Sequence, residues 1–404
     1  MLIKIAWKNI WRNRVRSFVV MGAIILGVWA TIFMISFSYG MVRSYVDNAI
    51  ENQISHVQAH VPDFKKDREY QYYFENPDRV LAAAKKVAGY KGATVRTLIQ
   101  GALSTTKGMR GIEIRGVTPE SEASVTHIDQ KVIDGAYFQE DGKNQCLVSE
   151  RTAKKLGIKV RSKIVLTFQD LQGEVTAGAF RVIGIFDTGI APFDEGSVFV
   201  KSVDLNRLLG KESIAHEMAL LLNDPRQALP AKEYLQEQLP EFKVETYREI
   251  SPDVQLYESQ IQTSVTIFIV IIMLALVFGI INTMLMAVLE RYRELGMLMA
   301  IGMNKVRVFF MIFLETIFLA LVAVVPGLLL GYLSVQHFNK HGINLGAFSR
   351  GLEQFGMSEI IYPTVEQGVY VQMAIAVAIT AVLASIYPAW KAIKLRPVEA
   401  IRKI

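Results

Sequence analysis

The chain alternates between long apolar runs and one extended polar stretch. Four apolar runs are each long enough to cross about 30 Å of hydrocarbon as a helix. They lie at residues 18–40, 264–289, 308–335 and 369–387. This pattern predicts an α-helical membrane protein with four transmembrane helices, both termini on one side of the membrane, and the polar residues 41–260 on the other side.

Residues 41–260 show the alternation and turn signals of one folded α+β domain inserted between the first and second spans. A strand–helix–strand series near each end predicts two halves of one sheet. The β-rich residues 120–213 between them read as an insert. The expected strands are 56–61, 93–98, 111–115, 145–148, 163–168, 180–186, 197–200, 217–222 and 242–247, and the expected helices are 76–87, 151–156, 203–209 and 225–239.

The short segment 290–303 lies between the second and third spans, and its first five residues carry four charges. It therefore reads as a surface helix and not as part of a span. Its apolar positions recur at helical spacing and form a stripe that fits a groove, beside a thin strip at Gly296 and Ala300. The stripe consists of Leu295, Leu298, Met299 and Gly302. Gly302 can end this helix, and Asn304 can cap the next one.

Charge gives the orientation of the spans. Of the sixteen Lys and Arg outside residues 41–260, fourteen lie in the two terminal segments or between the second and third spans. This bias places both termini and the 290–303 helix in the cytoplasm, and the 41–260 domain outside. The hydrophobic content of 51% fits a membrane protein. The pI of about 9.1 follows from this topology, so no nucleic-acid partner is expected.

The segments that flank the spans are less distinctive. Residues 1–17 have the pattern of an amphipathic helix on the inner leaflet, with Ile3, Trp7, Ile10 and Trp11 on one face. A cytoplasmic extension of the first span is the alternative. A cleaved signal peptide is disfavoured because the apolar run is long and lacks an A-x-A-like site. Residues 388–404 read as a basic cytoplasmic tail, and residues 339–368 as an outer loop without a specific assignment.

The sequence offers no catalytic or metal-ligating constellation. Its outer histidines lack ligand spacing, and Cys146 is the single cysteine. A G-x-x-x-x-G-K-[ST] phosphate-binding loop is absent, so the chain is not expected to be an enzyme. Glu315 is an ionisable residue inside the third span. Structural pairing with interfacial water or with Arg307 is favoured over a functional role for it.

Two motifs near the cytoplasmic ends carry a family resemblance. ERxxELGxxxAxG occupies residues 290–302, and YPAWKAxKLxPVEAIR occupies residues 387–402. With the order of spans and outer domain, they resemble the permeases of type VII ABC transporters, which include FtsX, MacB and the lipoprotein-releasing LolC and LolE. The outer stretches CLVSERTAKKLGIKV and FRVIGIFDTG look most similar to the lipoprotein-releasing branch. Met299 stands where the family often has a basic residue, and Arg161-Ser162 replaces an expected Gly-Asp.

The resemblance implies that a separate ABC ATPase subunit binds ATP and Mg, with no cofactor in this chain. The residues implied to couple to it are Glu290, Arg291, Glu294, Leu295, Gly296, Leu298, Met299, Ala300 and Gly302. It also implies a dimer with a second permease copy or paralogue, in the inner membrane, that moves lipoprotein or lipid from the outer leaflet to an extracytoplasmic acceptor. Non-transporting mechanotransmission to an outer partner and MacB-like efflux are the alternatives.

A lipid-extracting cavity would place large apolar side chains at the outer ends of the first two spans. The candidates are Ile32, Phe33, Phe37, Tyr39, Ile267, Phe268 and Ile271. Ordinary lipid-facing or helix-packing roles are the alternative for each of them.

Overall fold

The computed structural model describes residues 2–12, 14–67 and 69–394. The predicted tail residues 395–404 lie outside this range. The chain forms two compact units. The helical unit comprises Met1–Val42, Ser259–Asn344 and Ile360–Ile404, and the sheet unit comprises Arg43–Glu258 and Leu345–Glu359. Four of the described helices are long and apolar enough to cross a membrane. With the α+β sheet unit, they confirm the predicted fold class.

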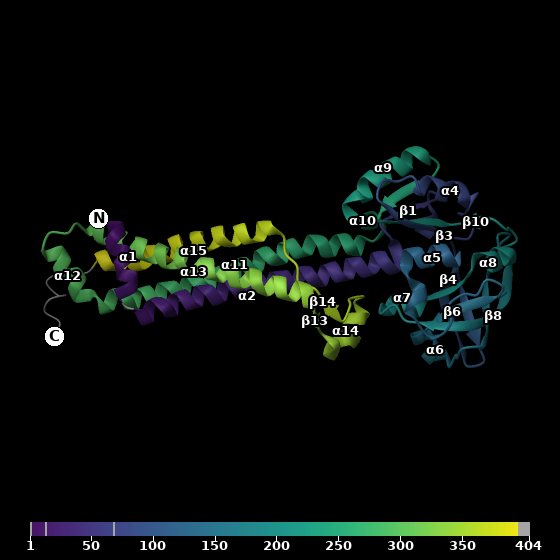
Figure 1. The fold of residues 1–404 in the computed structure, drawn as a ribbon, viewed down its shortest axis with the longest axis horizontal. Coiled ribbons are helices and arrows are strands. Elements are labelled where there is room, and N and C mark those ends of the chain that lie inside the picture. The colour runs from purple at the N-terminus through teal and green to yellow at the C-terminus, as the bar shows by residue number, and fades with distance from the viewer. Residues whose placement is uncertain (1, 13, 68, 395–404) are drawn as a thin grey trace. The chain divides into compact units, whose positions relative to one another are not determined.

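The long helices extend past the apolar runs that predicted them (Figure 1). The helices outside the sheet are α1 (Leu2–Arg12), α2 (Arg14–Ala49), α11 (Pro252–Glu290), α12 (Tyr292–Ala300), α13 (Lys305–His341) and α15 (Gln367–Ile393). The helix that contains the fourth predicted span continues past residue 387, because α15 runs through Pro388 to Ile393. Proline disfavours a helix interior, but Ala389 and Ala392 beyond it are fully buried in the helical core, and this packing supports the last turns.

Small residues on α13 allow α2 to approach it closely. A Cβ added to Gly331 would lie 2.8 Å from the Ile32 side chain, and one added to Gly327 would lie 3.0 Å from Val28. Ile32 and Val28 are both fully buried. Ile32 was predicted to line a lipid cavity, and this prediction is wrong, because its side chain fills the notch that Gly331 leaves.

The sheet unit is built on a ten-stranded sheet. Its strands are β1 (Val57–His60), β3 (Tyr90–Thr105), β4 (Gly108–Val117), β5 (Val132–Gly135), β6 (Gln145–Ser149), β7 (Lys163–Gln169), β8 (Val175–Phe186), β9 (Ser197–Lys201), β11 (Glu217–Leu222) and β12 (Lys243–Thr246). Its principal helices are α4 (Pro77–Ala84), α5 (Pro119–Thr126), α6 (Glu150–Leu156), α7 (Ala191–Gly196), α8 (Ser202–Leu209), α9 (Ala228–Gln238) and α10 (Tyr247–Ile250).

The strands within the β-rich residues 120–213 pair with both strands of a long hairpin that lies outside this range. Strands β3 and β4 form one long hairpin, paired from Arg96↔Val117 to Thr105↔Gly108. Strand β4 pairs with β9, β9 with β6, β6 with β8, β8 with β7, and β7 returns to β3. These six strands therefore close a ring around the core that contains Leu103, Ile114 and Leu166. Strand β3 joins this ring to β11 and through it to β1 and β12, whereas β5 pairs with β8.

Two of the long helices, α2 and α11, connect to neighbouring strands of the sheet. Helix α2 is followed by a π-helical turn, η1 (Ile50–Ile54), and then by β1. Strand β12 precedes α10, which a capping box at Thr246 and Glu249 begins, and α11 starts at Pro252. Strands β1 and β12 pair antiparallel, with Val57 opposite Thr246. The paths of α2 and α11 therefore meet in one strand pair.

Candidate functional site

Helix α12 carries most of the predicted 290–302 motif and has defined ends. Gly302 adopts a φ of 102°, which favours glycine. Its N–H donates to the Met299 carbonyl at 3.1 Å. The side-chain oxygen of Asn304 accepts a hydrogen bond from the Val306 N–H at 3.1 Å and caps α13. The predicted cap at Asn304 and the positive φ at Gly302 are confirmed, so the turn between α12 and α13 is encoded locally.

The predicted apolar stripe of α12 faces the helical unit itself. Leu295 is buried in the core of this unit, and Gly296 is buried beside it. Leu298 and Met299 are partly buried and pack against the same core. The stripe is therefore not an open surface that waits for a groove in another protein. Its apolar contacts hold α12 against the ends of the long helices.

The outward face of α12 consists of other residues. Met297 is 53% exposed and Ile301 is 80% exposed. Ala300 and Gly302, which belong to the predicted set, are exposed beside them, as is Glu290 at the end of α11. Sequence reasoning missed Met297 and Ile301. The sequence did contain a relevant signal. Apolar residues lie on nearly every side of this helix, so some of them had to stay exposed whichever face packed inward.

A buried ion pair joins the start of α12 to α13. The Arg291 guanidinium donates to the Glu315 carboxylate at 3.0 Å, and Glu315 is only 1% exposed. The Asn9 amide of α1 lies 3.5 Å from the same carboxylate. The predicted pairing of Glu315 is correct in kind, and Arg291, which immediately follows α11, is a partner that the sequence reasoning did not name. A buried carboxylate requires such partners, because removing its charge from water is costly.

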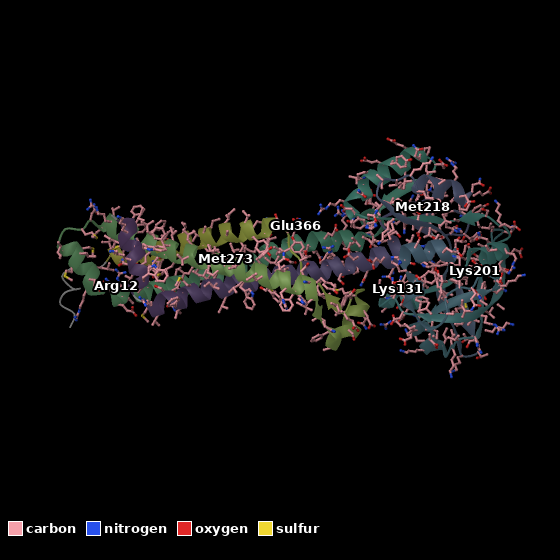
Figure 2. All side chains as sticks on the ribbon, in the orientation of Figure 1. Arg12, Lys131, Lys201, Met218, Met273 and Glu366 are labelled. Atoms are coloured by element: carbon pink, nitrogen blue, oxygen red, sulfur yellow. The ribbon has the colours of Figure 1, made fainter. Side chains whose placement is uncertain are left out.

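A second carboxylate extends this cluster to α1. Glu294 accepts a hydrogen bond from the Arg12 guanidinium and another from Arg291 Nε at 3.3 Å. The Arg12 bond is the main reason that the pKa of Glu294 lies below its usual value, with Arg291 contributing in the same direction. We call Asn9, Arg12, Arg291, Glu294 and Glu315 the α12 ion cluster. Figure 2 labels Arg12 at the end of the helical unit that carries α12.

Helix α1 lies across the ends of the long helices (Figure 1). Ile10 is fully buried in the helical core, whereas Ile3, Trp7 and Trp11 are exposed. The ring of Trp7 meets Phe318 of α13 edge-on at 6.1 Å. The predicted single apolar face is thus divided, because Ile10 packs inward and the two tryptophans remain outside. The Ser17 hydroxyl donates to the Ile10 carbonyl at 2.6 Å, which residues seven apart in a straight helix cannot do, so α1 is not a simple extension of the first span.

The predicted cavity residues do not gather around one space. Phe33 packs between Trp29 and Phe338, with ring centroids 6.3 and 5.6 Å away. Ile267 and Ile271 of α11 are more than half exposed. The remaining candidates, Phe37, Tyr39 and Phe268, are partly buried. The structure therefore separates a packed group on α2 from an open apolar face on α11.

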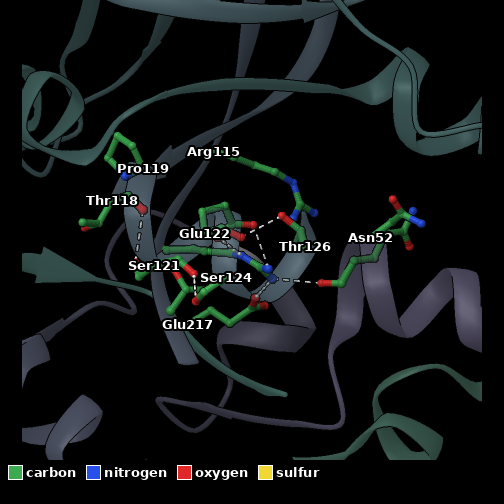
Figure 3. Close-up of polar contacts among 12 residues, drawn as sticks. Asn52, Arg115, Thr118, Pro119, Ser121, Glu122, Ser124, Thr126 and Glu217 are labelled. Carbon is green, nitrogen blue, oxygen red and sulfur yellow. Dashed lines mark hydrogen bonds and ion pairs between the residues drawn. The ribbon is translucent and has the colours of Figure 1, made fainter. Parts of the chain in front are cut away.

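A second cluster fastens the end of α2 to the sheet (Figure 3). The Arg96 guanidinium donates to Glu122 at 2.9 and 3.0 Å and to Glu217 at 2.8 Å. It also donates to the Gln53 carbonyl of η1 at 2.9 Å. Arg96 and Glu122 are fully buried. The four residues thus form a clamp of η1, β3, α5 and β11, which we call the Arg96 clamp.

Lys131 provides a further link to η1. Its ammonium group donates to the Asn52 side chain at 2.6 Å and to the Thr126 carbonyl at 2.8 Å. Burial lowers the pKa of Lys131, and nearby carboxylates, Glu51 first among them, oppose this shift. Two basic side chains therefore hold the η1 turn. Arg96 does so from β3, and Lys131 does so from the segment after α5.

Three histidines of the sheet unit, His56, His60 and His216, make structural contacts. His56 accepts a hydrogen bond from the Leu222 N–H at 3.1 Å, and His216 accepts one from the Leu98 N–H at 3.3 Å. Burial lowers the pKa of both to about 4. His60 contacts Glu245 at 2.8 Å. Within the described residues, no group of three or more His, Cys, Asp and Glu side chains is arranged to hold a metal ion.

Comparisons with known families match almost the whole chain. The family described as "MacB-like periplasmic core domain" matches residues 17–238. The family described as "FtsX-like permease C-terminal" matches residues 266–397. The first match covers most of α2 and most of the sheet unit, and the second covers α12, α13 and α15.

Individual relatives share low sequence identity with this chain, but some match it over nearly its whole length. An uncharacterized ABC transporter permease of Methanocaldococcus jannaschii is 23% identical over 99% of this chain and 97% of its own length. The lipoprotein-releasing system transmembrane protein LolC of Neisseria meningitidis is 24% identical over 97% of this chain and 95% of its own length. The pyoverdine export ATP-binding/permease protein PvdT of Pseudomonas syringae is 23% identical over 81% of this chain but only 50% of its own length.

Solved structures match part of the chain. The extracellular domain of the noncanonic ABC-type transporter YknZ covers 47% of this chain at 18% identity and a TM-score of 0.34, with 99% of that domain matched. The periplasmic region of MacB from Actinobacillus actinomycetemcomitans covers 52% at 13% identity and a TM-score of 0.37, with 97% of it matched.

Proposed function

Because this chain belongs to the family of ABC transporter permeases that combine a MacB-like periplasmic core domain with an FtsX-like C-terminal half, we propose that it is driven by ATP hydrolysis in a separate ATPase subunit. It is a multi-pass membrane protein with an extracytoplasmic domain. In the proposal it lies in the inner membrane with both termini in the cytoplasm, and the sheet unit is the extracytoplasmic domain. ATP and Mg are bound by the partner, and no cofactor resides in this chain.

The contact with the ATPase is the outward face of α12. Met297 and Ile301 are the exposed apolar residues there, and exposed apolar side chains at a helix end favour docking in a hydrophobic groove. Arg291 and Glu294 belong to the α12 ion cluster, so they transmit a displacement of α12 to α1 and α13 and do not themselves form the contact. This refines the predicted coupling set: Leu295, Gly296, Leu298 and Met299 support the helix from within.

Mechanical motion is the output of the permease. The observation that carries this proposal is that α2 and α11 lead into the paired strands β1 and β12. Long helices are stiff elements, and a change in the angle between them alters the strands they join. The Arg96 clamp and Lys131 hold the η1 turn rigidly to the sheet, so little of this motion is lost in the joint.

The cargo is a lipoprotein or lipid drawn from the outer leaflet and handed to an extracytoplasmic acceptor. Among the four candidate spans, α11 is the least buried by the rest of the protein. In its most apolar 18-residue stretch 17% is buried, compared with 50% in α13. Ile267 and Ile271 lie on this open face. A second permease copy or paralogue that faces α11 would create a lateral entry for acyl chains. The similarity to LolC proteins supports this cargo class.

Two other outputs use the same motion. One is regulation of an extracytoplasmic partner without transport. The other is efflux, favoured by the similarity to a pyoverdine export protein over 81% of this chain. These outputs differ in what contacts the α11 face during turnover.

Photocrosslinking at Ile267 and Ile271 tests the proposal in the native complex. A crosslinker at Leu321 of α13, which is 47% exposed, is the matched control on another span. We expect lipoprotein or acylated adducts, identified by mass spectrometry, at the α11 positions only and only with ATP. Capture of an unacylated small molecule there would favour efflux. Adducts with protein partners alone at both α11 positions would favour the non-transporting alternative.

A further inference from the structure

The two edge strands of the ten-stranded sheet are covered differently. Strand β12 lies at one edge, and its last three residues are buried. Helix α9 packs against it, and the Gln236 side chain of α9 accepts a hydrogen bond from the Val244 N–H at 3.1 Å. Strand β5 lies at the other edge, where Ile133, Asp134 and Gly135 are exposed. Among the described residues, β8 is the strand that pairs with β5, and no strand pairs with its outer edge.

The β5 edge is open to further pairing. A bare edge presents unpaired N–H and C=O groups, and proteins commonly shield it with lysine, proline or a covering segment. Strand β5 has the sequence Val-Ile-Asp-Gly, and Ile133 is 55% exposed. The register with β8 passes from Val132 directly to Asp134, so Ile133 is left without a paired residue. An extended peptide pairs with such an edge through its main chain, and this is a recurring mode of recognition.

A groove of about 610 Å³ lies beside β5. Ile133 and Asp134 line it from β5, and Ala153 lines it from α6. Its deeper lining is apolar, because Ile158 and Ile185 are buried there. Asp134 and Ile185 are opposite each other in the sheet, so their side chains lie on one face, which is the face that carries the groove. Since side chains alternate along a strand, a strand added to β5 would project every second side chain onto this face.

The charges around the groove select among such segments. Lys107, Lys154 and Lys159 line it, together with Asp134 and Glu150. Lys154 and Glu150 form an ion pair at 2.8 Å and offset each other. Within the described part of the chain, no carboxylate forms an ion pair with Lys107 or Lys159. Two ammonium groups and one carboxylate therefore remain, and the groove attracts an acidic side chain more than a basic one.

We propose that β5 and this groove bind an extended segment of another extracytoplasmic protein, which adds a strand to the sheet. The segment carries an aliphatic and an acidic residue two positions apart, because residues i and i+2 of a strand project to the same face. The aliphatic side chain packs on the apolar lining, and the acidic one pairs with Lys107 or Lys159. A second copy of β5 does not supply this pattern, because Ile133 and Asp134 are adjacent in sequence. The proposal rests on the proposed orientation, in which the sheet unit is extracytoplasmic, but not on the cargo.

Peptide display tests the site without transport. The full-length protein in nanodiscs, without nucleotide, ATPase or cargo, selects from a displayed library of short random peptides. Ile133→Lys adds an edge-protecting charge at an exposed side chain and is the counter-selected variant. Val175→Lys makes the same change on β8, where the side chain is 74% exposed, and is the matched control.

We expect peptides with an aliphatic and an acidic residue two positions apart to bind the wild-type protein and Val175→Lys about tenfold more tightly than Ile133→Lys. Lys107→Glu with Lys159→Glu should weaken the same peptides by a similar factor, because the charges that attract the acidic residue are reversed. Methylation of every second main-chain nitrogen should abolish binding in one of the two possible alternations, because those N–H groups pair with β5.

Other outcomes would overturn the proposal. Selection of no peptide over Ile133→Lys, or of basic peptides, would remove the site. Binding that both methylated forms retain would remove the added strand. A disulfide-linked dimer of Ile133→Cys chains in place of peptide binding would assign the edge to a second copy of the chain. Because neither ATP nor cargo is present, a failure of the proposed function leaves these outcomes unchanged.

Discussion

At the scale of single residues, the structure explains why a charged side chain is tolerated inside a span. Glu315 is one of the most deeply buried charged residues of the helical unit, and Arg291 and Asn9 reach it from two different segments. A buried ion pair is not a strong source of stability in itself, since desolvation offsets much of the attraction. The larger effect appears when one partner is removed, because the other charge then stays buried with weaker compensation.

Replacement of Arg291 tests this effect. We expect Arg291→Gln to lower the free energy of unfolding in detergent by about 3–5 kcal/mol, because the buried Glu315 carboxylate then loses the cation 3.0 Å from it. The double variant Arg291→Met with Glu315→Leu should recover most of the loss. Lys305→Gln, at an exposed position, is the control and should change the free energy by less than about 0.5 kcal/mol. Equal stability of Arg291→Gln and the control would contradict the pairing.

Asp194 gives a pH dependence in the sheet unit. Burial raises its pKa to about 7, while Thr188 donates to its carboxylate at 2.7 Å and opposes the shift. The folded state therefore keeps a proton between about pH 4 and pH 7 that the unfolded state releases, and stability falls as pH rises through this window. We expect Asp194→Asn to raise the unfolding midpoint at pH 7.5 relative to wild type by about 2–4 °C more than at pH 5.

The comparison must be made between the variant and the wild-type protein, because other groups titrate in the same range. The lowered pKa values of His56 and His216 have the opposite effect, so their contribution is lost as pH falls through about 6.5 towards 4. These terms are common to both proteins and cancel in the difference. A difference that does not change between pH 5 and pH 7.5 would show that Asp194 titrates normally.

At the scale of elements, the periodicity of apolar residues predicted the positions of helices and strands. It predicted less well which face of each element is buried. Helix α12 has apolar residues on nearly all sides, so its sequence marks the helix but does not distinguish the face that packs inward, at Leu295, from the face that stays open, at Met297. That choice is made by tertiary contacts with α11 and α13, which have no local signal. The same reason separates Ile32, which fills a notch beside Gly331, from the exposed Ile267.

Substitution on the open face of α12 tests which side meets the ATPase. We expect Met297→Asp or Ile301→Asp to reduce copurification of the ATPase at least severalfold, because a carboxylate in an apolar groove loses its hydration without gaining a partner. Met109→Asp makes the same change at an exposed site of the sheet unit and should leave the yield of complex intact. An undiminished yield with both α12 variants would remove this face from the interface.

The sheet shows a different limit of sequence reasoning. The alternation along residues 93–98 and 111–115 predicted two short strands, whereas β3 and β4 are one hairpin of 16 and 10 residues. Gly101 in β3 interrupts the apolar pattern, but a Cβ there would lie 2.6 Å from the Thr167 carbonyl, so glycine is needed for the close approach of β7. Closure of the six-stranded ring depends on such nonlocal pairing, and for this reason residues 120–213 read as a separate insert.

At the scale of the whole molecule, the order of spans and domain was the most predictable property. This order rests on the lengths of the apolar runs and on the distribution of Lys and Arg. Both are averages over many residues, so a wrong interpretation of a few positions does not change them. The orientation in the membrane still follows from charge alone. A reporter fused after Ile404 should be cytoplasmic, and a protease-sensitive tag inserted after Gly142 should be accessible only from outside. Detection of both tags on one side would contradict the four-span topology.

The transmission of force depends on how firmly α2 is held to the sheet. The Arg96 clamp is the most buried polar contact at this joint, and it reaches the Gln53 carbonyl at 2.9 Å. Arg96→Met alone would leave Glu122 and Glu217 buried without their cation and should destabilise the sheet unit by about 3–5 kcal/mol. That variant would lose function merely by unfolding, so it does not test transmission.

A triple replacement isolates the mechanical role. Arg96→Met with Glu122→Leu and Glu217→Leu removes all three charges together, which buried ion clusters often tolerate. The fold should persist while the bond to the Gln53 carbonyl is lost. We expect ATP hydrolysis by the reconstituted complex to be unchanged, and cargo release per ATP to fall severalfold because η1 can slip against β3. The exposed pair Arg79 and Glu241, 2.8 Å apart, supplies the control Arg79→Met with Glu241→Leu, which should release cargo normally. Full release by the triple variant, with its fold verified by circular dichroism, would show that the joint transmits force through the helix-to-strand connections without the clamp.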